Sequence, residues 1–457
     1  MQRRDFLKAT TAAGAAATAR GLAMAAGTAT GVAKPTTQTQ SATPEWMVVI
    51  RVYGSILYAT KKWGAQAGEK PIPLSPEHID DWISDCAKHG VTTVLWRANC
   101  AGTLTYPSKF TALPGEPPLP NPNRGMGVAS VNQGWPVEDW RWLGNQCKRF
   151  NTLAAAVKAA HRHGLELCLD FHVFDMVGSW CRRSQWPAGG DRAWDPDLWL
   201  WSRDQTQRLA GVPCYADPRV RERRLAEIGE ALAFGVDGVV LGFFSHCDGQ
   251  AGEKRCEFGY NPVVVREYKR RNGVDPLTGA VDAHRFYALH GEYFTQFVRQ
   301  ASELVHDRGK KLICCTRTDG VHGWGGKVAG GGLVGRMEPR DLRDGKSKLP
   351  LAGGFYLESE KWAREGLLDG LLCSAPLQDG IQAIRQLKHE TTVPVYLWRK
   401  YTGFKGRVTP MGLDGFRKEV LATRRGEIDG YCLLIMQITQ HPWFKPDWRD
   451  VLAPPKG

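Results

Sequence analysis

Residues 218–244 read PRVRERRLAEIGEALAFGVDGVVLGFF and contain one complete unit of the fold. Apolar residues recur with helical spacing up to Phe234, and Gly235 follows, the residue type favoured just after the end of a helix. The apolar run from Val236 to Phe244 then has the length and composition of a strand that is buried on both faces. This stretch therefore predicts a helix followed by a buried strand.

The same unit recurs along most of the chain. Strand-like runs are expected at residues 47–53, 91–98, 165–173, 236–244, 311–318, 368–375, 393–399 and 428–436. Helical patterns lie between them, and those at residues 77–90, 152–164 and 413–426 also end in glycine. Eight such repeats predict the α/β class, as a single (β/α)8 TIM-type barrel with long βα loops. An open doubly wound sheet is the alternative, but residues 51–62 lack the Gly-rich nucleotide loop that normally follows its first strand.

Composition excludes several classes of protein. Hydrophobic residues make up 42% of the chain and charged residues 23%, the balance of a globular protein. Beyond the N-terminal region no apolar run is long enough to span a membrane, so no stable membrane insertion is expected. The net charge of +13 could favour acidic ligands, but the basic residues are scattered and no zinc-finger spacing is present. We therefore expect no nucleic-acid partner, and the oligomeric state stays open.

The first residues have the features of an export signal. QRRDFLK at residues 2–8 is similar to a twin-arginine signal, a weakly apolar stretch follows, and Ala23-Met24-Ala25 offers a cleavage site. We expect a signal peptide at residues 1–25, a linker at 26–44 and the barrel at 45–457. An amphipathic helix of the mature protein is the alternative. Export by this route would place the protein in the periplasm or outside the cell.

Twelve cysteines in an exported chain raise the question of disulfides. Those in strand-like or helical runs are expected to be buried small hydrophobic residues, namely Cys86, Cys168, Cys314, Cys315, Cys373 and Cys432. The other six form three local couples, Cys100 with Cys147, Cys181 with Cys214, and Cys247 with Cys256. We expect at least two of these couples to be bridged.

Two segments resemble one family of barrel proteins. Residues 214–244 contain Tyr-x-x-Pro-x-Val-Arg and then Val-Asp-Gly, and residues 258–276 read FGYNPVVVREYKRRNGVDP. Both resemble the centre of the family-10-like glycosyl hydrolases, and the resemblance implies a (β/α)8 fold and activity on sugars. Members of that family place an aspartate late in the fourth strand, where this chain has Gly242. A barrel that only binds carbohydrate is therefore the alternative to an active glycosidase.

Alternation along the strands selects the residues that face the barrel axis near its carboxyl end. Leu165, Leu167, Leu169 and Phe171 share the apolar parity of the third strand and should face the helices. The opposite parity then directs a mainly polar set inward, namely Arg51, Tyr53, Arg97, Asn99, Cys168, Asp170, His172, Gly242, Phe244, His246, Arg317 and Asp319. Active sites of (β/α)8 enzymes lie at this end of the barrel.

Glycoside hydrolysis needs two carboxyl groups. Asp170 and Asp319 are the expected catalytic pair, and Asp248 and Glu338 are the substitutes. The expected substrate-binding residues are Arg51, Arg97, His172, His246, Arg317 and Trp398. Each also has a structural interpretation: the arginines could pair with Asp170, the histidines could be core residues, and Trp398 could pack in the core.

These arginines, together with Arg399, predict a cationic mouth and a preference for an anionic glycan, uronic-acid-containing or sulfated. Arg399 is the uncertain member, because its parity matches Val395 and it could face the helices. The leading interpretation is an exported glycoside-hydrolase-like protein that acts on a polysaccharide or oligosaccharide and needs no cofactor. A metal-dependent hydrolase is a further alternative, because Asp170-x-His172 and His246-x-Asp248 could bring metal ligands together on neighbouring strands.

Overall fold

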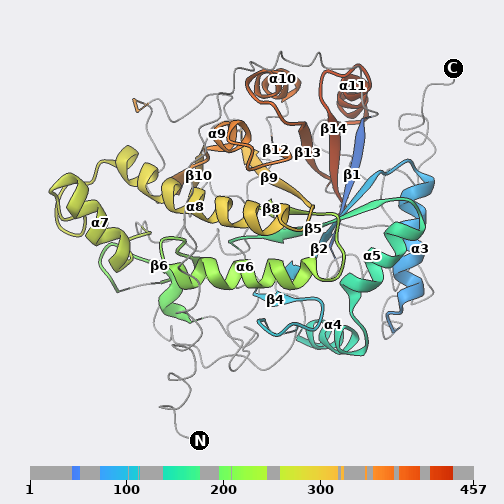
Figure 1. Cartoon of the computed structure of the whole chain (residues 1–457), viewed down its shortest axis with the longest axis horizontal. Helices are drawn as coiled ribbons and strands as arrows, with labels where there is room; N and C mark the ends of the chain where they lie inside the picture. The colour runs from blue at the N-terminus through green and yellow to red at the C-terminus, as the bar shows by residue number, and fades with distance from the viewer. Residues whose placement is uncertain are drawn as a thin grey trace, which may run out of the picture. The chain divides into compact units, whose positions relative to one another are not determined.

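The computed structural model describes residues 44–51, 73–100, 102–111, 113, 137–174, 195–206, 208–243, 258–317, 321–323, 345–346, 354–374, 380–401 and 412–435. Eight parallel strands close into a barrel in the order β1-β14-β13-β12-β9-β8-β5-β2 (Figure 1). Their bounds are β1 Glu45–Arg51, β2 Thr93–Arg97, β5 Glu166–His172, β8 Gly238–Gly242, β9 Lys311–Arg317, β12 Gly370–Ser374, β13 Val395–Tyr401 and β14 Gly430–Ile435. All eight expected strands are confirmed, and so is the (β/α)8 barrel. The doubly wound alternative is wrong, because an open sheet has two free edges and this sheet has none.

Helices follow the strands around the barrel. They are α3 Pro76–Lys88, α4 Val137–Arg149, α5 Thr152–Arg162, α6 Pro218–Leu232, α7 Pro262–Asn272, α8 Ala283–His306, α9 Ser359–Arg364, α10 Gly380–Glu390 and α11 Gly412–Arg424. The glycines expected after helices have left-handed backbone, as at Gly164 (φ 71°) and Gly235 (φ 85°), where a side chain would be strained. The chain can therefore turn directly from α5 into β5 and from α6 into β8.

Short antiparallel strand pairs lie in three of the connections at the carboxyl ends of the strands. Strands β3 (Asn99–Cys100) and β4 (Thr103–Leu104) follow β2, and β10 (Val321–Gly323) and β11 (Gly354–Tyr356) follow β9. After β5, the short helix η3 (Pro196–Leu198) leads into the hairpin of β6 (Trp199–Trp201) and β7 (Arg208–Pro213). These short strands are the described parts of three of the loops at the mouth of the barrel.

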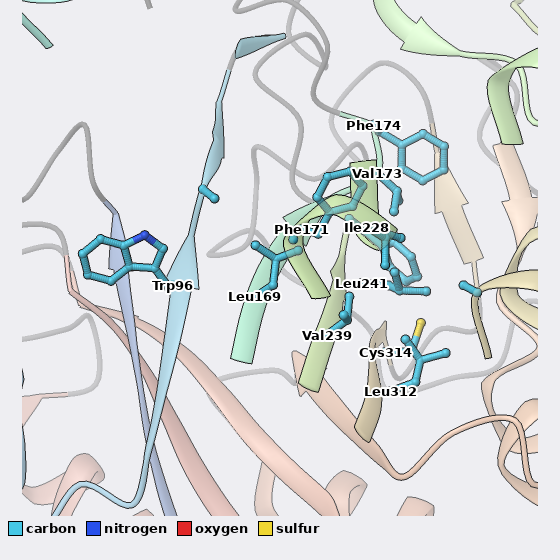
Figure 2. Packing of buried hydrophobic residues seen from close by; sticks show 14 of the residues in the cluster. Trp96, Leu169, Phe171, Val173, Phe174, Ile228, Val239, Leu241, Leu312 and Cys314 are labelled. Atoms are coloured by element: carbon cyan, nitrogen blue, oxygen red, sulfur yellow. The ribbon is translucent and has the colours of Figure 1, made fainter. Parts of the chain in front are cut away.

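The core has an outer and an inner layer, as the alternation along the strands predicts. Leu169 and Phe171 of β5 and Leu241 of β8 pack with Ile228 of α6 in the outer layer (Figure 2). The inner layer fills the barrel with Met47, Val49, Leu95, Cys168, Val240, Ile313, Leu372, Tyr396, Trp398 and Cys432. Because Cys168 belongs to the inner layer, Asp170 and His172 share its inward parity.

At the amino-terminal end of the barrel the same kind of hydrogen bond occurs four times. A side chain just before or at the start of every second strand accepts a hydrogen bond from a backbone N–H of the preceding strand. The four pairs are Trp46 with Thr92 (2.9 Å), Leu167 with Asp237 (2.9 Å), Leu312 with Asp369 (2.7 Å) and Val395 with Asp429 (2.9 Å). The aspartate of the Val-Asp-Gly motif is one of these four acceptors, so its role is to join strands at the end opposite the mouth.

Two expected disulfides are not formed. Cys147 of α4 and Cys214 after β7 are buried free thiols, so the couples with Cys100 and Cys181 are not bridged. Burial raises the pKa of each thiol to about 12, as expected for unreactive packing residues. The third couple, Cys247 with Cys256, lies outside the described residues. The prediction of at least two bridges is therefore wrong.

The expected signal peptide and linker fall in residues 1–43, outside the part of the chain that the structure describes. Within the described residues, no helix is both long and apolar enough to cross a membrane.

Candidate functional site

A buried ion pair lies inside the barrel at the carboxyl ends of two neighbouring strands. Arg97 and Asp170 are level with each other in β2 and β5, and the Arg97 Nε donates to the Asp170 Oδ2 over 2.7 Å. Both side chains are at least nine-tenths buried. The sequence had left open whether Arg97 contacts a ligand or an acid, and the structure pairs it with Asp170.

This pairing fixes the charge of Asp170. Burial alone would raise the pKa of the carboxyl group, but the positive charge of Arg97, the neighbouring imidazole of His172 and their hydrogen bonds together lower it well below its usual value. Asp170 is therefore an anion throughout the physiological pH range.

His172 is held from two sides. Its Nε2 lies 3.4 Å from the Asp170 Oδ1. Its backbone N–H donates to the Asn99 Oδ1 (2.8 Å), and its carbonyl oxygen accepts from the Asn99 Nδ2 (2.7 Å). The side-chain amide of Asn99 thus clamps the end of β5, and Asp170 orients the ring. Arg97, Asp170 and His172 form one group, which we call the mouth triad.

The position of Gly242 is explained by His172. The two residues are level in β5 and β8, and a Cβ atom on Gly242 would lie 2.8 Å from the His172 Nε2, with the ring Cδ2 closer still. The same Cβ would lie 3.1 Å from the Asp170 Oδ1. A side chain at position 242 and the imidazole of His172 cannot share this space. The family that the sequence resembles has an aspartate at this position. In this chain His172, from the neighbouring strand β5, occupies that volume.

Two inward residues of β9 are partly exposed. Cys315 packs against the inner core, and Arg317 has the same parity two residues further along; both are partly accessible to solvent. Burial and the charge of Asp170 raise the pKa of Cys315 to about 12, so its thiol is not an activated nucleophile.

Trp398 and Arg399 face opposite sides of β13. Trp398 packs into the inner core and is only 8% exposed, which favours packing over stacking on a sugar. Arg399 faces the helices and pairs with Glu419 of α11, whose other oxygen accepts from Tyr431. Arg399 therefore makes no contribution to a cationic mouth.

Ser374 at the end of β12 was not among the sequence candidates. It is buried and has the inward parity of Leu372, and it pairs in register with Arg317 and Trp398. The alternation of β12 was the signal that could have found it.

The remaining candidates fall outside the described residues. These are Asp319, Asp248, Glu338 and His246, together with the side chain of Arg51, although the backbone of Arg51 lies at the end of β1, level with Arg97. Their proposed roles stay predictions.

The Tyr-x-x-Pro-x-Val-Arg motif supports the end of β5 from outside the barrel. The Tyr215 hydroxyl donates to the carbonyl oxygen of Val173 (2.8 Å), and the Arg221 Nη1 donates to the carbonyl oxygen of Tyr215 (2.5 Å). Arg224 also donates to the Val173 carbonyl oxygen (3.3 Å) and pairs with Glu227 (2.7 Å). The motif therefore positions the strand that carries Asp170 and His172.

Metal binding gains no support from the described part of the barrel. No group of three or more candidate ligands is present among its residues. The guanidinium group of Arg97 already contacts one oxygen of Asp170, the Oδ2.

No protein-family model and no curated protein matches the chain. Among solved structures, it is similar to alpha-L-fucosidase isoenzyme 2 from Paenibacillus thiaminolyticus, with a TM-score of 0.46 and 14% identity over 90% of this chain and 48% of that one. A GH20 exo beta-N-acetylglucosaminidase from Vibrio harveyi gives a TM-score of 0.42 and 12% identity over 90% of this chain and 53% of that one. The catalytic domain of a beta-amylase from Paenibacillus polymyxa gives a TM-score of 0.41 and 10% identity over 87% of this chain and 94% of that one.

This chain thus spans about half the length of the first two of these proteins. The closed order of the eight strands establishes the fold.

Proposed function

We propose that the protein is an exported glycoside-hydrolase-like barrel that acts on a polysaccharide or oligosaccharide, preferentially an anionic one. The observation that carries the proposal is the mouth triad, a polar group built into the end of the barrel where (β/α)8 enzymes have their active sites. The resemblance of residues 214–244 and 258–276 to family-10-like glycosyl hydrolases supports a sugar as the substrate.

The charge state of Asp170 limits its role in such a reaction. Hydrolysis of a glycosidic bond needs one protonated acid and one base or nucleophile. Because Arg97 keeps Asp170 ionised, Asp170 can act as the nucleophile or base, or stabilise positive charge in the transition state, but it cannot be the acid. The acid then has to come from another loop, and Asp319 is the first candidate, with Asp248 and Glu338 as substitutes.

A barrel that binds a glycan without cleaving it is the second candidate function. The observation that favours it is the engagement of Asp170 by both Arg97 and His172, which leaves less of the carboxylate for a substrate. A metal-dependent hydrolase is less well supported, since Arg97 already engages one of the two oxygens of Asp170.

One experiment separates these functions. The purified full-length protein is incubated with a panel of neutral, uronic-acid-containing and sulfated polysaccharides, with and without a chelator, and products are resolved by chromatography. Shorter oligosaccharides released from an anionic polysaccharide, unaffected by the chelator, are the expected result. Binding without products would favour the binding barrel, loss of product on chelation would favour the metal enzyme, and neither binding nor product would refute the proposal.

A further inference from the structure

Part of the loop that follows β2 is hydrogen-bonded to α6. Residues 109–111, which come shortly after β4, each take part in one of these hydrogen bonds, and we call them the docked segment. The three bonds join the Lys109 N–H to the Glu230 Oε1 (2.9 Å), the Arg223 Nη2 to the Phe110 carbonyl oxygen (2.7 Å), and the Thr111 hydroxyl to the Glu227 Oε1. Because helix positions 223, 227 and 230 are four and three residues apart, they lie on one face of α6.

Glu227 also contacts the side chain that supports the end of β5. Its other oxygen, Oε2, accepts from the Arg224 Nη1 (2.7 Å), and the Arg224 Nη2 donates to the carbonyl oxygen of Val173 (3.3 Å). Val173 directly follows His172, and its N–H donates to the Gly242 carbonyl oxygen (3.0 Å). One carboxylate therefore connects the docked segment with the end of the strand that carries two members of the mouth triad.

The side chains that make this connection are shielded from water. Glu227 is 1% exposed, and Thr111 and Arg224 are each 3% exposed. Hydrogen bonds to ionised groups are about twice as strong as those between neutral groups, and in a buried network each bond depends on its neighbours. The position of the docked segment and the position of the end of β5 are therefore linked through Glu227.

We propose that Glu227 is a positioning residue for the mouth triad. The docked segment holds its Oε1, its Oε2 holds Arg224, and Arg224 holds the carbonyl group that follows His172. Release of the docked segment should therefore make the end of β5 more mobile, and because coupling between two sites is reciprocal, a looser end of β5 should loosen the docked segment. The inference rests on the proposed function for its effect on turnover, whereas the coupling itself is measured without a substrate.

Hydrogen exchange of backbone amides in the full-length protein tests the coupling. Exchange is followed by mass spectrometry, with fragmentation that resolves the amides of Lys109 and Val173. Thr111→Val removes the hydroxyl group and keeps the shape of the side chain. Loss of a hydrogen bond to a charged group should speed exchange at Lys109 about 10- to 100-fold. Coupling of ordinary size should speed exchange at Val173 about fivefold or more.

Two matched variants separate this coupling from a general loss of stability. Thr111→Ser keeps a hydroxyl group and should return both exchange rates to near those of the wild type. Thr423→Val removes a buried threonine hydroxyl from α11, where it donates to the Glu419 carbonyl oxygen (3.0 Å), and should leave both rates unchanged.

The coupling can also be measured from its other end. Tyr215→Phe removes the second donor to the Val173 carbonyl oxygen (2.8 Å) without touching the docked segment. Reciprocity requires that this change speeds exchange at Lys109 as well. This variant decides the question even if Thr111→Val does not fold.

Turnover tests whether the coupling positions the mouth triad. On a polysaccharide of the panel from which the wild-type protein releases products, Thr111→Val should lower kcat about tenfold and leave KM within about twofold. The reason is that the change displaces reacting groups but removes no contact with the substrate. Thr111→Ser should restore kcat.

Faster exchange at Lys109 without any change at Val173 in Thr111→Val would overturn the inference. The same holds if Thr423→Val speeds exchange at Val173 equally, or if Thr111→Ser fails to restore it. An unchanged kcat in a variant with faster exchange at Val173 would overturn the positioning role. Absence of turnover on every polysaccharide would count against the proposed function as a hydrolase, while the exchange rates would still decide the coupling.

Discussion

Replacing Gly242 with alanine places a methyl group where the ring of His172 already lies. The new Cβ would be 2.8 Å from the His172 Nε2, closer than real Cβ atoms approach other atoms. Neither side can move easily. The backbone of β8 is held by Val173, whose N–H donates to the Gly242 carbonyl oxygen (3.0 Å), and Asn99 clamps the backbone of His172.

Overpacking of this kind typically costs about 1–3 kcal/mol. When His172 is alanine as well, the nearest remaining atom is the Asp170 Oδ1 at 3.1 Å, which requires only a small adjustment. Gly242→Ala should therefore destabilise the wild-type protein by about 1–3 kcal/mol and the His172→Ala protein by much less. The two substitutions should show a coupling energy of about 1 kcal/mol or more.

Urea unfolding of the wild type, Gly242→Ala, His172→Ala and the double variant measures the coupling energy. Gly229→Ala in α6 is the matched control, because among the described residues the atoms nearest its Cβ are the Leu304 methyl groups at 4.0 Å. Because alanine is more stable than glycine in a helix interior, Gly229→Ala should raise the free energy of unfolding by about 0.5–1 kcal/mol. If the costs of Gly242→Ala and His172→Ala add to within about 0.5 kcal/mol, the steric explanation of Gly242 is refuted.

Three further predictions concern other parts of the barrel. Glu419→Gln should lower the free energy of unfolding by about 3–5 kcal/mol, because it removes the negative charge that faces the buried guanidinium group of Arg399. Replacing Glu419 and Arg399 together by Leu and Met should cost far less, and an equal cost in urea titrations would contradict the pairing. His290 should make the free energy of unfolding depend on pH, because burial lowers its pKa to about 3 in the folded protein. As the pH falls below about 6.5, the unfolded state therefore binds a proton that the folded state does not. The free energy of unfolding should then fall by about 1.4 kcal/mol per pH unit until about pH 3. His290→Gln should remove that slope between pH 7 and 5, and an unchanged slope would rule this origin out. Alkylation of the denatured, non-reduced protein should label Cys147 and Cys214, and mass spectra that show either in a disulfide would disprove their assignment as free thiols.

The positions of the strands, and which of their side chains point towards the barrel axis, could be predicted from the sequence. Strands buried on both faces give continuous apolar runs, so all eight were found to within a few residues. Alternation then directed Arg97, Asp170 and His172 inward, and the pairing of Arg97 with Asp170 was one of the alternatives considered.

What the sequence could not show depends on contacts between distant residues. Gly242 looked like the loss of a carboxylate, and only the position of His172, seventy residues earlier, explains it. Cys147 and Cys214 were placed in loops that could be bridged, whereas one lies in α4 and both are packed in the core. Local patterns carry no information about such packing.

The proposed catalysis at the mouth triad is tested most directly by the turnover of Asp170→Asn on a polysaccharide of the panel from which the wild-type protein releases products. The double variant Arg97→Gln with Asp170→Asn is measured alongside it, because it leaves no unpaired buried charge and so guards against simple unfolding. We predict that both variants lose about 100- to 10,000-fold in turnover, while circular dichroism shows that at least the double variant keeps the fold. Wild-type turnover in a folded variant without the Asp170 carboxylate would contradict the account.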